Sequence, residues 1–178
     1  MRMQNDSWVQ RTLISGTVSG VATALAASVA GKRDAESYAA PLNATSHILW
    51  GDEAAQHDEP SLKYTVTGFL LTHASAIFWA SIYEKWFAPR EEDGNASPLQ
   101  PLIGAAVVTA GAYVTDYYLV PRRFTPGYEK RVSGKSLTAI YGVLALGLAA
   151  RALMARRDND HQWQQPWQEG RQLQQQDY

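Results

Sequence analysis

The stretch Thr12–Gly31, TLISGTVSGVATALAASVAG, runs for about twenty residues without a formal charge. Tyr64–Tyr83 and Gly94–Thr115 share this property, and a shorter charge-free stretch covers Ser136–Ala150. Since 19% of the residues are charged, one charge is expected every five or six positions. A helix needs about 20 mostly apolar residues to cross a bilayer. The charge gaps therefore predict an all-α, multi-pass membrane protein.

The chain of 178 residues is expected to form one membrane domain over residues 1–157. We expect a bundle of four transmembrane helices, with spans at about 12–31, 64–83, 101–120 and 136–155. Arg151 should then extend its side chain to the far interface. Residues 158–178 form a Gln-rich polar tail, whose composition favours disorder or ordering by a partner.

Two other interpretations of the apolar segments fit the sequence less well. A soluble helical bundle suits the mean composition, which is 46% hydrophobic. However, a soluble helix normally carries a charged outer stripe, which these segments lack. The first span could be a signal peptide with a cleavage site at Ala27–Ala30. Its charge-free stretch fills a whole membrane thickness, which favours a span.

The loop between the first two spans contains the segment Pro41–Gly51, PLNATSHILWG. Pro at the start and Gly at the end are typical of a short helix. Leu42, Thr45, Ile48 and Leu49 would share its apolar side. We expect a short interfacial helix that lies along the membrane surface or dips into it.

Small residues recur at four-residue spacing in two spans. Gly16, Gly20 and Ala24 do so in the first, and Gly134 and Gly142 form a similar stripe in the last. Such stripes let helix backbones approach closely. They predict helix packing, either within the chain, which is the favoured interpretation, or between two copies.

Ionisable residues inside spans are costly and are functional candidates. His73 and Asp116 qualify, and the short hairpin between their spans predicts that the two helices are antiparallel neighbours. The two side chains should then converge, with hydroxyls nearby on Thr72, Ser75 and Thr115. The pair could carry protons, bind a solute or form half of a metal site. It could also simply be a buried hydrogen-bonded pair that fixes the helix register.

Basic residues flank the last two spans, at Arg122, Arg123, Lys130, Arg131 and Lys135. Each such charge near an anionic lipid surface contributes about 1 kcal/mol, so contact with lipid headgroups is expected. The 16 Lys and Arg residues divide eight to eight between the two predicted sides, so the positive-inside rule leaves the orientation open.

Other functional signatures are weak or missing in the sequence. The chain has no cysteine, which excludes disulfides and thiolate chemistry. His47 and His57 match no zinc spacing, so we expect no metal site. The chain also lacks a Gly-rich phosphate loop and the GxSxG and HExxH motifs, so we expect no cofactor and no catalytic residue. The net charge of −1 indicates no broad basic surface of the kind that binds nucleic acid.

Three strings carry a resemblance to a known group: Pro41–Gly51, Thr72–Trp86 (THASAIFWASIYEKW) and Asp116–Arg131 (DYYLVPRRFTPGYEKR). They resemble small inner-membrane proteins of proteobacteria and, more weakly, the YagU-like family. The shared motifs are the Thr72-His73 pair inside a span and the Thr125-Pro126 turn after a later one. The resemblance implies a helical bundle in a bacterial inner membrane, and it carries over no enzymatic activity to this chain.

These observations predict a non-enzymatic accessory or scaffold subunit of a membrane complex, with a protein partner or a second copy beside the lipid bilayer. The alternative is a small proton or solute transporter or channel that uses His73 and Asp116. A cavity that reaches both side chains would favour the alternative.

Overall fold

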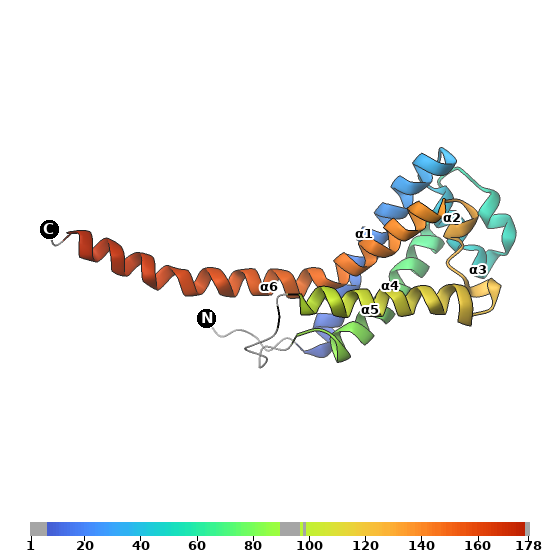
Figure 1. Cartoon of the computed structure of the whole chain (residues 1–178). Coiled ribbons are helices and arrows are strands. Elements are labelled where there is room, and N and C mark those ends of the chain that lie inside the picture. Colours follow the sequence, from blue (N-terminus) through green and yellow to red (C-terminus); the bar gives the residue numbers. More distant parts are fainter. Residues whose placement is uncertain (1–6, 90–96, 98, 177–178) are drawn as a thin grey trace.

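The computed structural model describes residues 7–89, 97 and 99–176, with the backbone alone at 156 and 158–176. Over these ranges every regular element is helical, as the charge pattern predicts. The long helices are α1 (Trp8–Ala35), α4 (Thr65–Trp86), α5 (Gln100–Val114) and α6 (Gly134–Gln176) (Figure 1). The short elements are α2 (Ala40–Thr45), α3 (His47–Trp50), the 3₁₀ turns η1 (Asp52–Gln56), η3 (Arg122–Phe124) and η4 (Tyr128–Lys130), and the π-helical turn η2 (Thr115–Leu119).

Four helical segments in the described part of the chain are long and apolar enough to cross a membrane, at 8–35, 65–86, 100–119 and 134–155. They overlap the four predicted spans. Only 22% of the apolar window in α4 and 28% of that in α5 is buried inside the bundle. Leu25, Leu70 and Val107, on three different helices, are all more than half exposed. The outward faces of the bundle are thus apolar.

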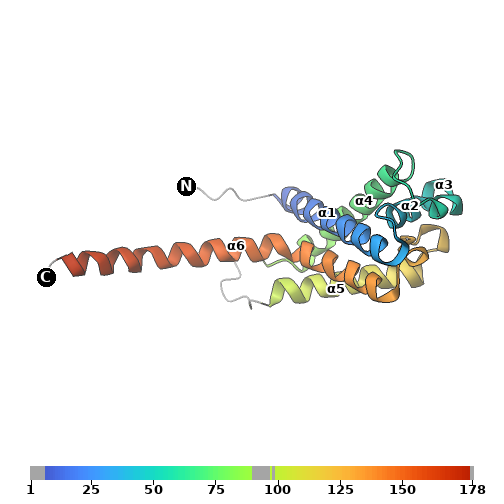
Figure 2. The same ribbon diagram turned by 90° about the horizontal axis from the view of Figure 1, so that it is seen from above.

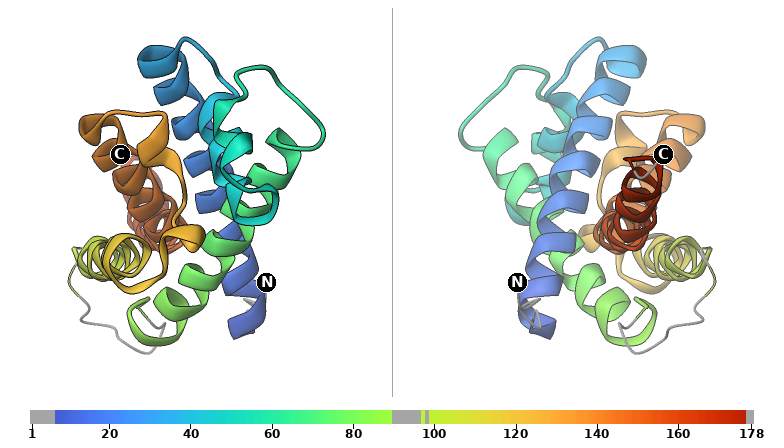
Figure 3. Two further views of the ribbon diagram at one scale, coloured as in Figure 1. Left: turned by 90° about the vertical axis from the view of Figure 1, so that its right-hand side faces the viewer. Right: turned by 90° about the vertical axis from the view of Figure 1, so that its left-hand side faces the viewer.

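Helix α1 lies in the middle of the bundle because one of its faces carries only small side chains. The buried positions include Ser15, Gly16, Ser19, Gly20 and Thr23, spaced three and four residues apart. This spacing places them on one helix face. That face packs on both α4 and α6, and α5 lies on the other side of α6 (Figure 3).

Helices α4 and α5 are adjacent in sequence but are not close neighbours along their length. They meet near the hairpin, where Gly104 lies against Phe87 and the Tyr83 hydroxyl donates to the Pro101 carbonyl at 3.3 Å. From there they diverge, since α5 packs mainly on α6 and α4 mainly on α1. The expectation of two antiparallel neighbours thus holds only at the hairpin end.

The segment expected to form one interfacial helix folds into two short helices, of which α2 and the start of α3 pack inside the bundle. Residues 40–47 are buried on every side, against α1, α4 and η4, whereas Leu49 and Trp50 are exposed. Asn43 contributes to the burial of this segment. Its amide Nδ2 donates to the carbonyls of His57 (2.9 Å) and Glu59 (3.0 Å). Its Oδ1 accepts from the Thr65 hydroxyl at 2.6 Å, so the buried amide holds the following loop against α4.

The Gln-rich tail is the continuation of α6. The helix runs unbroken to Gln176, and its second half projects away from the other helices (Figures 1 and 2). Isolated helices are marginally stable in water, and Pro166 lacks the amide hydrogen that continues the helical ladder. That a partner orders this segment stays a prediction.

Candidate functional site

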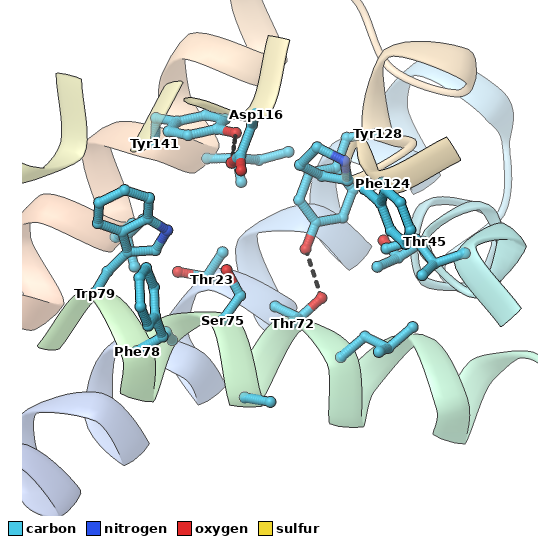
Figure 4. A pocket seen from close by; sticks show the side chains of 17 residues that line it. Thr23, Thr45, Thr72, Ser75, Phe78, Trp79, Asp116, Phe124, Tyr128 and Tyr141 are labelled. Atoms are coloured by element: carbon cyan, nitrogen blue, oxygen red, sulfur yellow. Dashed lines mark hydrogen bonds between the residues drawn. The ribbon is translucent and has the colours of Figure 1, made fainter. Parts of the chain in front are cut away.

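A cavity of about 380 Å³ lies where α4 diverges from α5. Its walls come from α1, α2, α3, α4, α6 and the segment after α5 (Figure 4). The lining is mostly apolar and aromatic, with a few polar groups. The lining residues are Thr23, Thr45, Ile48, Leu71, Thr72, Ala74, Ser75, Ala76, Phe78, Trp79, Asp116, Phe124, Pro126, Tyr128, Ile140, Tyr141 and Leu144.

Asp116 is the single acidic residue among those that line the cavity. The Tyr141 hydroxyl of α6 donates to its Oδ2 at 2.6 Å. The bond joins the end of α5 to α6, and Tyr113 and Tyr117 pack their rings on Tyr141 behind it. The carboxylate therefore sits at one wall, with its position fixed by a hydrogen bond.

The local backbone explains why Asp116 points into the cavity. Helix α5 widens into the π turn η2, in which the Val120 amide donates to the Thr115 carbonyl at 3.0 Å. Pro121 follows and cannot continue the helix. Turns of this type inside α-helices are frequent at functional sites, because they rotate side chains out of the regular helical register.

A second hydrogen bond closes the loop side of the cavity. The hydroxyls of Tyr128 and Thr72 lie 2.8 Å apart. Tyr128 is buried, and burial raises its pKa to about 12, so the phenol stays protonated at neutral pH. Gly127, at φ 79°, lets the chain turn tightly here against the Ala44 carbonyl and the His47 ring.

One polar atom in the wall lacks a partner. The Thr23 hydroxyl is buried and makes no hydrogen bond, although Thr23 is only 5% exposed. Figure 4 shows Thr23 and Ser75 directed toward the space in front of Asp116. An unpartnered buried hydroxyl costs roughly 1–3 kcal/mol, so this position in the wall is energetically unfavourable as it stands.

The predicted polar residues divide between this cavity and its surroundings. Asp116, Thr72 and Ser75 line it, and Thr115 and His73 do not. His73 faces α1: a Cβ atom added to Gly20 would lie 2.7 Å from Nδ1 of His73. The His73 ring also stacks on Phe69. Its Nδ1 has no hydrogen-bond partner. His73 and Asp116 thus do not share this cavity, because α4 and α5 diverge.

The predicted packing glycines also divide. Cβ atoms built at Gly16 and Gly20 would lie within 3 Å of α4 atoms, so these positions and buried Ala24 pack within the chain. At Gly134 and Gly142 a Cβ would meet nothing within 4 Å. On α6 it is Gly147 that packs closely, against Ser19 of α1, and the four-residue spacing did not point to it. Which face of α6 meets α1 depends on the rotation of α6 about its axis, which the sequence does not determine.

Two of the five basic residues expected at lipid headgroups bind the first loop instead. Lys130 pairs with Asp52, and Arg131 pairs with Asp58 and donates to the Ala55 carbonyl at 2.8 Å. The Lys130 ammonium lowers the pKa of Asp52 below its ordinary value.

The side chains of the other three basic residues, Arg122, Arg123 and Lys135, are exposed. They remain available for the predicted headgroup contact. The acidic first loop and the basic segment after α5 thus neutralise each other on one side of the bundle.

A buried charge cluster that the sequence pattern did not predict lies at the opposite end of the bundle. The Glu84 side chain is fully buried and accepts hydrogen bonds from Ser15 and Arg151, with Arg11 Nε 3.6 Å away. Arg151 therefore turns inward rather than extending to the far interface. Glu84 lies beside Lys85 at the end of a predicted span, where an interfacial position is the usual expectation.

The described residues contain no group of three or more His, Cys, Asp or Glu side chains that could hold a metal ion. No family model, no curated protein and no solved structure matches the chain. The resemblance to YagU-like proteins therefore stays a prediction.

Proposed function

We propose that the chain is a multi-pass protein of a bacterial inner membrane that acts as a non-enzymatic accessory or scaffold subunit. The membrane assignment is supported by the outward faces of the four long helices. Monomeric soluble proteins rarely expose large contiguous apolar patches, and here apolar side chains such as Leu25, Val107 and Leu146 are more than half exposed.

The observation that best supports a scaffold role is the projecting half of α6. This half of the helix runs beyond the bundle to Gln176, and no other helix of the described part of the chain lies beside it in either view (Figures 1 and 2). A helix without tertiary packing is marginal in water. A partner protein, or the same segment of a second copy, would supply the missing contacts.

Two measurements test the proposal. Carbonate or high salt should leave the protein in native membranes, and its release without detergent would contradict the membrane assignment. In mild detergent, the full-length chain should elute with a stoichiometric partner or as a homo-oligomer. A variant that ends at Arg157 should lose this association. A monodisperse full-length monomer with no companion protein would contradict the scaffold role.

A further inference from the structure

We propose that the cavity beside Asp116 binds the ammonium group of an amphiphile that enters from the bilayer. This inference rests on the proposed membrane location and goes beyond the scaffold role. The shared chemistry is a positively charged ammonium group at the polar end of an amphiphile. It is found both in aminophospholipids such as phosphatidylethanolamine, where a phosphate joins it to the apolar chains, and in free lipophilic amines.

The charge of the ligand follows from the surroundings of Asp116. Its described hydrogen-bond partner is the neutral Tyr141 hydroxyl, and none of the ion pairs among the described residues includes Asp116. The other charged side chain that acts on it, Glu129, has the same sign. An ionised carboxylate in a mostly apolar cavity is costly without a counter-charge, so a cationic group is the complement that the site lacks.

Aromatic walls suit the same ligand. Phe78, Trp79, Phe124 and Tyr128 line the cavity with Asp116. Aromatic faces attract ammonium groups, and cages of this kind recognise quaternary ammonium ligands. The Thr23 and Ser75 hydroxyls supply further oxygen atoms toward the space in front of the carboxylate (Figure 4).

The cavity is open toward the outward face of α4. Three of its lining residues there, Ala74, Ser75 and Phe78, are exposed, although they also border the cavity. In a membrane this face would meet lipid chains. The volume of about 380 Å³ is at the low end of known ligand pockets, about 300–1,000 Å³. It therefore fits a head and part of a chain rather than a whole two-chain lipid.

The test uses the purified full-length protein in neutral maltoside micelles and measures saturable binding of octyltrimethylammonium. Neutral octyl glucoside and anionic octyl sulfate serve as chain-matched comparisons. We expect saturable binding of the cation alone, weakened about tenfold or more by Asp116→Asn, which preserves shape and removes the charge. Glu53→Gln, which neutralises an exposed carboxylate on the loop, is the matched control and should bind as the wild type does.

A second variant leaves the carboxylate intact. Ser75→Leu narrows the mouth on the outward face of α4 and should also weaken binding. The melting temperature of each variant reports its folding separately. The idea is wrong if binding of the cation does not saturate, if octyl glucoside binds equally well, or if folded Asp116→Asn protein binds the cation as the wild type does.

Lipid nanodiscs distinguish the two sources. If phosphatidylethanolamine in the disc competes with octyltrimethylammonium, the natural occupant is a membrane lipid. If discs with and without it give equal binding, the occupant is a free amine, and the ammonium assignment stands in either case. Membrane location is measured independently by carbonate extraction, so its failure and the failure of this binding site remain distinguishable.

Discussion

The guanidinium of Arg151 in α6 holds both carboxylate oxygens of Glu84 in α4. Arg151 Nε donates to Oε1 at 3.1 Å and Nη2 donates to Oε2 at 2.9 Å. Ser15 of α1 donates to Oε1 as well. One fully buried carboxylate thus joins the three helices that form the centre of the bundle.

Removal of the carboxylate should destabilise the bundle. Glu84→Ala leaves the Arg151 charge partly buried without its partner, and breaking a buried pair in this way costs about 3–5 kcal/mol. We expect a clearly lower melting temperature in detergent. The matched control is Glu59→Gln, whose side chain is exposed, with an expected change within about 0.5 kcal/mol.

The same pair can be tested by a double-mutant cycle. Because Arg151 is unpaired once Glu84 is gone, the Glu84→Ala/Arg151→Ala double variant should lose less than the sum of the two single variants. Additive losses in thermal unfolding would show that the contact does not couple α4 to α6.

Two glycines of α6 form a matched pair for the packing of α1. A Cβ at Gly147 would lie 2.5 Å from the Ser19 Cα, whereas a Cβ at Gly142 would meet nothing within 4 Å. We expect Gly147→Ala to lower stability by about 1–3 kcal/mol, because the α1 backbone must shift. Gly142→Ala should be neutral or stabilising by up to about 1 kcal/mol, since Ala favours helix. Equal melting temperatures for the two variants would contradict the packing.

Asn43 should control the order of the first loop. Asn43→Ala leaves the His57 and Glu59 carbonyls without their donor, and unsatisfied groups of this kind cost roughly 1–3 kcal/mol. Limited proteolysis with a Glu-specific protease should then cleave faster at Glu59. Gln56→Ala, at an exposed position in the same loop, is the control. Unchanged cleavage of the Asn43→Ala variant would show that the amide does not hold the loop.

The contact between the first loop and the segment after α5 should weaken in acid. Lys130 lowers the pKa of Asp52 from its ordinary value of 3.8 in the folded protein. The contribution of this group to stability is therefore fully present above about pH 4 and is lost as the pH falls through the lower folded pKa. The protection factors of the residue 52–58 amides, which correct for the slower intrinsic exchange in acid, should fall in this window, and Lys130→Gln should reduce this pH dependence. A fall of the same size in Lys130→Gln would mean that another group is responsible.

The four long helices were predictable because each contains a charge-free apolar stretch. The buried face of α1 was also visible in the spacing of Gly16, Gly20 and Ala24. How the helices pair was not, since this depends on the rotation of each helix about its axis. The sequence therefore gave no sign that α4 and α5 diverge, which separates His73 from the cavity that Asp116 lines.

Glu84 shows the second limit. A carboxylate at the end of an apolar segment has two readings, a solvated group at the interface or a buried partner of a distant cation. Only the packing of α1, α4 and α6 brings Arg151 and Ser15 to it. Asn43 is similar, because its partners His57 and Glu59 lie 14 and 16 residues further along the chain.

Cysteine labelling tests the central claim, that these four helices cross a membrane, most directly. The chain has no cysteine, so single substitutions need no altered background. Leu25→Cys and Val107→Cys replace side chains that are 63% and 51% exposed on the outward faces, and Glu59→Cys marks the loop. In permeabilised cells, a hydrophilic maleimide should label Glu59→Cys. It should leave the other two cysteines unlabelled until a denaturing detergent dissolves the membrane and unfolds the protein. Equally fast labelling at all three positions would contradict the account, because it would mean that the apolar faces meet water.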